Sequence, residues 1–247
     1  MRTFGFSTGS LARGDVSKAL HMAAQHDTDA VEYSALRIGE LETMVDYLVT
    51  HGTGHFGYVA FHAPSRFSAQ EEGKVVAFLQ KLAKQFAEKL TLHIVVHPDA
   101  IHDHKLWQSF GETLCVENMD HRKPIGRTAD ELDAVFEKLP KARLCFDIGH
   151  AHEIDRSMSV GYEILRRYRN RIAHVHASEV SDDCEHRAFS ASSHAAFIKV
   201  ADMIPKTAPV ILETDVPENR VGGQLKEARH IFQGSFVKHT KARRPKG

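Results

Sequence analysis

The sequence predicts an α/β fold, a (β/α)8 TIM barrel that forms a single domain. Eight short apolar or β-branched segments alternate with helical segments, which is typical of parallel strands joined by crossover helices. The chain has 247 residues, close to the about 250 of such a barrel. No Gly- or Ser-rich linker interrupts the alternation. No G-x-G-x-x-G follows the first strand, which disfavours an open dinucleotide-binding sheet.

The expected strands are short, and most run directly into polar residues. They cover residues 3–7, 29–33, 58–64, 92–96, 113–116, 143–146, 172–175 and 210–212. An exit loop of Thr8, Gly9 and Ser10 is expected after the first strand. Between the strands, apolar residues recur every three or four positions, which predicts helices. These helices cover residues 16–26, 41–49, 68–86, 106–110, 128–139, 162–168, 194–203 and 225–231.

Composition limits the classes of partner. Lys plus Arg and Asp plus Glu each number 32, so no net charge favours nucleic acid or an anionic membrane. The three cysteines are isolated, which predicts free thiols and a cytoplasmic location. No segment approaches the about 20 apolar residues of a membrane span. The barrel is expected to cover residues 1–237, and residues 238–247 are expected to form a basic, disordered tail.

Side chains that can bind metals follow or end six successive strands. They are His62, His97, Glu117, Asp147, His176 and Glu213. Because the carboxyl ends of all barrel strands open on one face, we expect these side chains to meet at one mouth. Alone, such a histidine is usually a hydrogen-bonded loop residue and such an acid often caps a helix. Together they predict a metal centre, and imidazoles with carboxylates suit zinc, manganese, iron or cobalt.

The segment after the sixth strand carries a second candidate histidine. Asp147 ends the strand, and His150 follows it three residues later. Gly149 between them is expected to let the backbone turn sharply.

At this point the chain resembles the xylose isomerase-like TIM barrels. This superfamily joins sugar isomerases and epimerases with endonuclease IV-type enzymes that cut DNA at abasic sites. Six short motifs, in the same order along the chain, carry the resemblance. They are Phe61-His62-Ala63-Pro64, Val96-His97-Pro98, Val116-Glu117-Asn118, Phe146-Asp147-Ile148-Gly149-His150-Ala151, His174-Val175-His176 and Ile211-Leu212-Glu213-Thr214.

The resemblance implies one to three divalent metal ions per chain. The first would be held by Glu117, Asp147, His176 and Glu213. A second, as in the endonuclease branch, would lie between Glu117 and two histidines. These are His62 and His97.

A third metal is implied less completely. His150 and His186 resemble two of its ligands, but Cys184 stands where the endonucleases have an aspartate, and Asp183 is only a neighbour. Ser65 likewise replaces a tyrosine that enters the DNA in the endonucleases.

Three functions remain open from the sequence. The preferred one is a sugar or sugar phosphate isomerase or epimerase, in which Glu117 and Glu213 move a proton next to a metal-bound carbonyl. Arg66 and Arg187 would bind the hydroxylated or phosphorylated small molecule, as could two further loop arginines. These are Arg122 and Arg127. The alternatives are a multi-metal AP endonuclease, which the neutral charge disfavours, and a non-catalytic metal-binding barrel. The sequence does not predict the oligomeric state.

Overall fold

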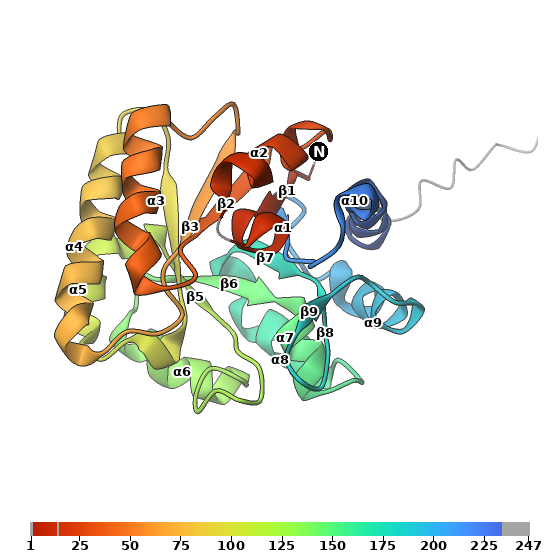
Figure 1. Cartoon of the computed structure of the whole chain (residues 1–247). Coiled ribbons are helices and arrows are strands. Elements are labelled where there is room, and N and C mark those ends of the chain that lie inside the picture. Colours follow the sequence, from red (N-terminus) through yellow and green to blue (C-terminus); the bar gives the residue numbers. More distant parts are fainter. Residues whose placement is uncertain (1, 14, 234–247) are drawn as a thin grey trace, which may run out of the picture.

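Eight parallel strands close into a barrel that helices surround (Figure 1). The computed structural model describes residues 2–13 and 15–233. The barrel strands are β1 (Phe4–Ser7), β2 (Ala30–Ser34), β3 (Tyr58–His62), β4 (Leu92–Val96), β5 (Leu114–Glu117), β6 (Arg143–Asp147), β7 (Ile172–Ala177) and β10 (Val210–Leu212). Each pairs with its neighbours in parallel, and β1 pairs with β10 to close the ring. The (β/α)8 prediction is confirmed.

Helices follow the strands along the chain and cover the outside of the barrel. They are α1 (Thr8–Ala12), α2 (Val16–Ala24), α3 (Ile38–His51), α4 (Ala69–Phe86), α5 (His104–Trp107), α6 (Ala129–Lys138), α7 (Ile148–Ile154), α8 (Ser159–Tyr168), α9 (Ala191–Ala201) and α10 (Glu218–Gln233), with 3-10 turns η1 (Pro98–Ala100), η2 (Gln108–Thr113) and η3 (Arg169–Arg171). Within the described residues, no helix combines the length and the apolar character needed to span a membrane. The predicted basic tail and the end of the domain at residue 237 lie outside the described residues.

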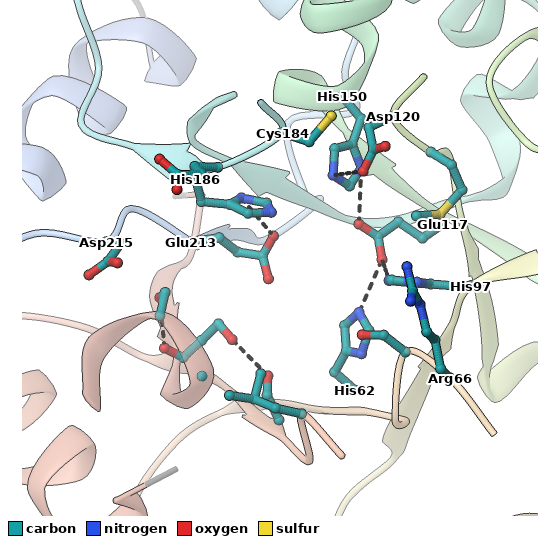
Figure 2. A pocket seen from close by; sticks show the side chains of 18 of the residues that line it. His62, Arg66, His97, Glu117, Asp120, His150, Cys184, His186, Glu213 and Asp215 are labelled. Carbon is teal, nitrogen blue, oxygen red and sulfur yellow. Dashed lines mark hydrogen bonds and ion pairs between the residues drawn. The ribbon is translucent and has the colours of Figure 1, made fainter. Parts of the chain in front are cut away.

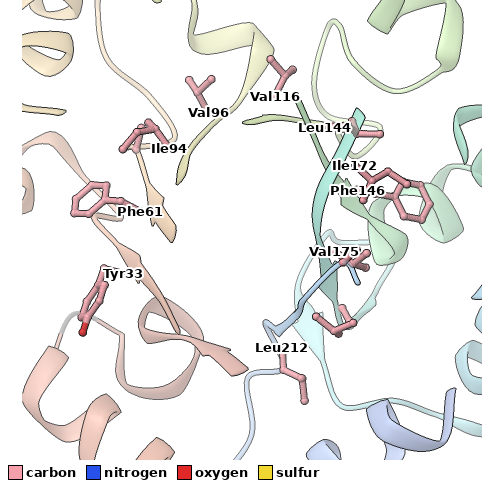
Figure 3. Close-up of a cluster of buried hydrophobic side chains, with 14 of the residues drawn as sticks. Tyr33, Phe61, Ile94, Val96, Val116, Leu144, Phe146, Ile172, Val175 and Leu212 are labelled. Atoms are coloured by element: carbon pink, nitrogen blue, oxygen red, sulfur yellow. The ribbon is translucent and has the colours of Figure 1, made fainter. Parts of the chain in front are cut away.

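Successive side chains along each strand alternate between the outer face of the barrel, which packs against the helices, and its interior. Tyr33, Phe61, Val116 and Phe146 belong to the large apolar cluster that the strands share with the helices (Figure 3). The residues next to them point to the other face of the sheet, into the barrel. Small side chains there form a separate cluster of four buried residues. These are Ala60, Val95, Cys115 and Cys145. The small interior residues leave space for polar side chains along the barrel axis.

One local prediction was wrong, and one element was not predicted. The expected loop after β1 is the short helix α1, in which Ser10 Oγ donates to the Ser7 carbonyl over 2.9 Å. Five residues with one large apolar side chain carry no helical repeat, so the sequence could not reveal this helix. The antiparallel hairpin β8 (Glu179–Val180) and β9 (His186–Arg187) was not predicted either.

Gly149 has a different role from the sharp turn that was expected. It lies inside α7, and a Cβ atom there would meet the Ser178 carbonyl oxygen at 2.5 Å. Glycine is therefore needed because α7 and the end of β7 approach closely, not for a special backbone angle. This contact holds α7 against the site described next.

Candidate metal centre

Four of the predicted ligands meet at the carboxyl end of the barrel. Glu117 and Asp147 are the last residues of β5 and β6, His176 lies near the end of β7, and Glu213 directly follows β10. One ligand atom from each lies within 4.8 Å of the others. Figure 2 shows Glu213 facing Glu117 across the pocket. The parallel register of the barrel thus brings together residues spread over almost one hundred positions of sequence.

A second group shares Glu117. His62 ends β3 and His97 follows β4, and their Nε2 atoms lie 3.1 and 3.3 Å from Glu117 Oε2. The other oxygen, Oε1, lies 3.3 Å from His176 Nδ1. Glu117 is therefore the side chain that joins the two groups, and each of its oxygens faces a different one.

Asp147 is held so that one oxygen stays free. Its Oδ1 accepts the backbone N–H of His150 over 2.7 Å. The Asn118 side chain holds the Asp147 backbone with two hydrogen bonds of 2.8 Å. The Oδ2 atom of Asp147 is buried and has no hydrogen-bond partner in the described part of the chain. A buried carboxylate oxygen without a donor is costly, and a bound cation would satisfy it. The site therefore fits a divalent metal ion.

Three histidines near the site turn one ring nitrogen towards an acceptor. His176 Nε2 lies 2.9 Å from Glu32 Oε2, His62 Nδ1 lies 2.7 Å from the Ala63 carbonyl, and His150 Nδ1 lies 2.9 Å from the Asn118 carbonyl. Because these oxygens can only accept, the nitrogen that faces them carries the proton. In a neutral ring the opposite nitrogen would keep a lone pair, which is the arrangement that metal-binding histidines use. Without a cation, burial lowers the pKa of His62, but its hydrogen bond to Glu117 and the charges of Glu117 and Glu32 raise that pKa to about 9.

Glu32 is a functional candidate that the sequence analysis missed. It lies in β2, is fully buried, and accepts from His176 at the bottom of the site. An acid in the middle of the buried strand Ala30–Ser34 was the available signal, because buried carboxylates occur only with partners.

The pKa values of the carboxylates in the site are shifted in opposite directions. Burial raises the pKa of Glu213 to about 7, and Glu117 and Glu32 add repulsion, against the attraction of His176. Burial also raises the pKa of Asp147 to about 6, although His150 opposes it. Burial would raise the pKa of Glu117 too, but His176, His62 and His97 hold that pKa well below its usual value. The crowding of acids again favours a cation at this place.

The two histidines of the third metal group each lie near carboxylates of the site. His150 Nδ1 lies 3.4 Å from Glu117 Oε1 and from Asp147 Oδ2, and His186 Nδ1 lies 3.7 Å from Glu213 Oε2. The rings of His150 and His186 lie 5.5 Å apart between centroids. Among residues 2–13 and 15–233, neither belongs to a set of three ligand atoms within 4.8 Å. Cys184 instead lies 3.5 Å from His121 Nδ1, in a group with Glu153. The roles of His150 and His186 as ligands stay predictions.

Glu117 and Glu213 of the quartet line a pocket of about 840 Å³, together with His62, His97, His150 and His186. Asp147 and His176 are fully buried and do not line it. Three of the four predicted substrate-binding arginines also line it, namely Arg66, Arg122 and Arg187. Arg127 does not line it and pairs with Glu131. Arg122 and Arg187 are paired with Asp120 and Glu185, whereas Arg66 makes no ion pair within the described chain. Of the four predicted arginines, Arg66 is thus the one best placed to bind an anionic group. Arg37, which was not predicted, also lines the pocket and makes no ion pair within the described chain.

Fold and site together define a (β/α)8 barrel with a histidine and carboxylate cluster at its carboxyl face. The chain matches the family model of the xylose isomerase-like TIM barrel over residues 26–233. It belongs to this family.

Solved structures with the same fold include sugar epimerases. D-allulose 3-epimerase from Methylomonas sp. has a TM-score of 0.66 and 14% identity, with 93% of this chain and 98% of that chain covered. 3-Keto-D-glucoside 4-epimerase from E. coli has a TM-score of 0.61 and 13% identity, with coverages of 93% and 99%. A D-psicose 3-epimerase has a TM-score of 0.60 and 15% identity, with coverages of 94% and 100%. At these identities the likeness establishes the fold alone. No curated protein sequence matches the chain.

Proposed function

We propose that this protein is a divalent-metal-dependent isomerase or epimerase of a sugar or sugar phosphate. The observation that carries the proposal is the quartet of Glu117, Asp147, His176 and Glu213, whose ligand atoms lie within 4.8 Å of one another beside an open pocket. The fold shared with sugar epimerases supports the same substrate class. The three free, buried cysteines suit a reducing cytoplasm as its location.

The quartet would hold one zinc, manganese, iron or cobalt ion. A divalent cation there would polarise a substrate carbonyl and make the neighbouring C–H proton more acidic. Glu213, which lines the pocket at the exit of β10, is suited to remove or return that proton. Glu117 faces Glu213 from β5, so the two carboxylates can reach a substrate carbon from two sides (Figure 2).

Substrate binding would use the pocket wall. Arg66 lines the same pocket as His97, and its guanidinium makes no ion pair with any described residue. A guanidinium binds phosphate with two parallel hydrogen bonds, so a phosphorylated ketose fits this wall. The pocket volume of about 840 Å³ lies in the range of small-molecule sites.

One observation favours the hydrolytic alternative. His62, His97 and Glu117 place three ligand atoms within 4.8 Å, next to the quartet. Two ions sharing Glu117 would suit phosphodiester cleavage by a metal-activated water. Whether the second group binds a metal therefore separates the two functions.

Solvent exchange tests the proposal directly. Metal-loaded protein is incubated in D2O with ketopentoses, ketohexoses and their phosphates, and proton NMR follows the C–H groups beside the carbonyl. We expect deuterium to enter one of these positions, because the abstracted proton mixes with solvent on a carboxylate. Glu213→Gln, which keeps the size of the side chain, should abolish the exchange. Cleavage of abasic-site DNA without any sugar exchange would reject the isomerase in favour of the endonuclease.

A further inference from the structure

Lys123 occupies an unusual position beside the second group of ligands. Its Nζ lies 3.1 and 2.9 Å from the two carboxylate oxygens of Asp99 and 3.3 Å from His97 Nδ1. The side chains of Lys123 and Asp99 are only 9% and 16% exposed. The lysine thus contacts both His97 and Asp99, and its charge is largely shielded from water.

The loop after β5 is built to place Lys123 there. Gly126 has a φ of 94°, and a Cβ atom at this position would lie 2.6 Å from Pro98 Cγ. The loop therefore lies directly on the η1 turn that begins with Pro98 and carries Asp99. The N–H of Met119 donates to the Gly126 carbonyl over 2.9 Å and closes the loop. Lys123 faces Asp99 and His97 from inside this closed loop.

The contact dictates the direction of the hydrogen bonds of His97. An ammonium group has donors and no acceptor, so the Nδ1 atom that faces Lys123 must accept. In the neutral ring the proton is then on Nε2, which lies 3.3 Å from Glu117 Oε2. A nitrogen that carries a proton has no lone pair for a metal. His62 approaches the same Glu117 oxygen, but its Nδ1 faces the Ala63 carbonyl, which is an acceptor and not a donor.

We propose that Lys123 keeps His97 from acting as a metal ligand and thereby limits the centre to one ion. His97 then serves as a hydrogen-bond donor to Glu117. This inference rests on the metal site of the proposed function. It explains why that site would hold one metal ion and not two. Lys123 is a positioning residue, because it acts on the site only through His97.

Asp99 provides a way to test the effect of Lys123 on His97 by replacing the lysine. Asp99 and His97 Nδ1 both contact Lys123 Nζ, so without the lysine we expect the Asp99 carboxylate to accept from His97 Nδ1. A carboxylate in this place would put the proton on Nδ1 of His97 and leave Nε2 without one. Glu32 acts on His176 in the same way, but there it faces Nε2 and leaves Nδ1 towards the site. Lys123→Met, which keeps the length and apolar stem, should therefore open the second site.

Cobalt counting on the full chain tests this. Protein stripped with a chelator is loaded with excess Co²⁺, desalted and measured by elemental analysis. We expect one cobalt per wild-type chain and two per chain for Lys123→Met. The matched control Lys123→Arg keeps a cationic donor and should hold one. The double variant Lys123→Met/His97→Ala should return to one, which shows that the added ion needs His97.

The outcomes separate this inference from the proposed function. Two cobalt ions in the wild type, or one in a folded Lys123→Met chain, would overturn the role of Lys123 and leave the quartet standing. A wild-type chain without cobalt would reject the metal centre and this inference together.

A measurement on the unmutated chain covers the case in which Lys123→Met does not fold. Long-range ¹H–¹⁵N spectra of metal-free protein distinguish the two tautomers of a histidine. The signal that disappears in His97→Gln should report a proton on Nε2, and the signal that disappears in His62→Gln a proton on Nδ1. A proton on Nδ1 of His97 would contradict the proposal.

Discussion

Two histidines face Glu117 at the same distance, yet their surroundings are opposite. His176 Nδ1 and His97 Nε2 each lie 3.3 Å from a Glu117 oxygen. Behind His176 lies the carboxylate of Glu32, whereas behind His97 lies the ammonium of Lys123. The group behind an imidazole decides which nitrogen carries the proton, so two similar contacts have different chemistry. On the proposals made above, the β7 side of the site would bind a cation, and the β4 side would donate a hydrogen bond.

The largest effect should come from Glu117, which both sides share. Glu117→Gln keeps the size and removes the charge, and we expect activity to fall by about 10²- to 10⁴-fold, the range for loss of a positioned acid or base. Circular dichroism should show an intact fold. Activity within a few-fold of wild type on the substrate found by deuterium exchange would mean that Glu117 has been misassigned.

The next effect compares the two histidines directly. His176→Ala should lower the affinity for Mn²⁺ by more than the about 10- to 100-fold that follows loss of a partner behind a ligand. His97→Ala should change it by less than about tenfold, because Lys123 turns its protonated nitrogen to the site. Isothermal titration of both variants provides the measurement. Equal losses would remove the distinction between the two sides.

The acid behind His176 should have an intermediate effect. Glu32→Gln should weaken Mn²⁺ binding by about 10- to 100-fold, because the amide no longer accepts firmly from His176 Nε2 and the ring loses its orientation. Glu88→Gln, on the exposed part of the chain after α4, controls for the loss of one negative charge. A Glu32→Gln chain that binds Mn²⁺ like this control would show that Glu32 only fills space.

The last prediction concerns pH. Metal binding requires ionised carboxylates, and Glu213 and Asp147 hold protons up to about pH 7 and 6 without it. The affinity for the metal ion should therefore increase as pH rises from about 5 to 8. The increase should be at most about tenfold per pH unit for each proton that the metal displaces. Titrations at several pH values check the slope. Glu213→Gln should bind more weakly but with a shallower slope, and an unchanged slope would argue against Glu213 as the titrating ligand.

The fold and much of the site follow from local patterns. Apolar residues recur every second position in the strands and every three or four positions in the helices, and the two kinds of segment alternate along the chain. The barrel predicted from this alternation is confirmed. Because parallel strands end on one face, the strand-end position of Glu117 and Asp147 was enough to predict that they would lie together. Their chemical roles remain proposals. The helix α1 and the hairpin β8–β9 escaped prediction because each is too short to show a repeat.

What the sequence determined by itself is the barrel and the set of side chains that face its mouth, since both depend on periodicity and on chain direction. Only the tertiary structure decided the partners behind those side chains. Glu32 reaches His176 across 144 positions, and Lys123 reaches His97 across 26. No spacing rule predicts such contacts, because they depend on barrel closure and on how one loop packs against another. The direction of a hydrogen bond depends on these neighbours, and with it the difference between a metal ligand and a proton donor.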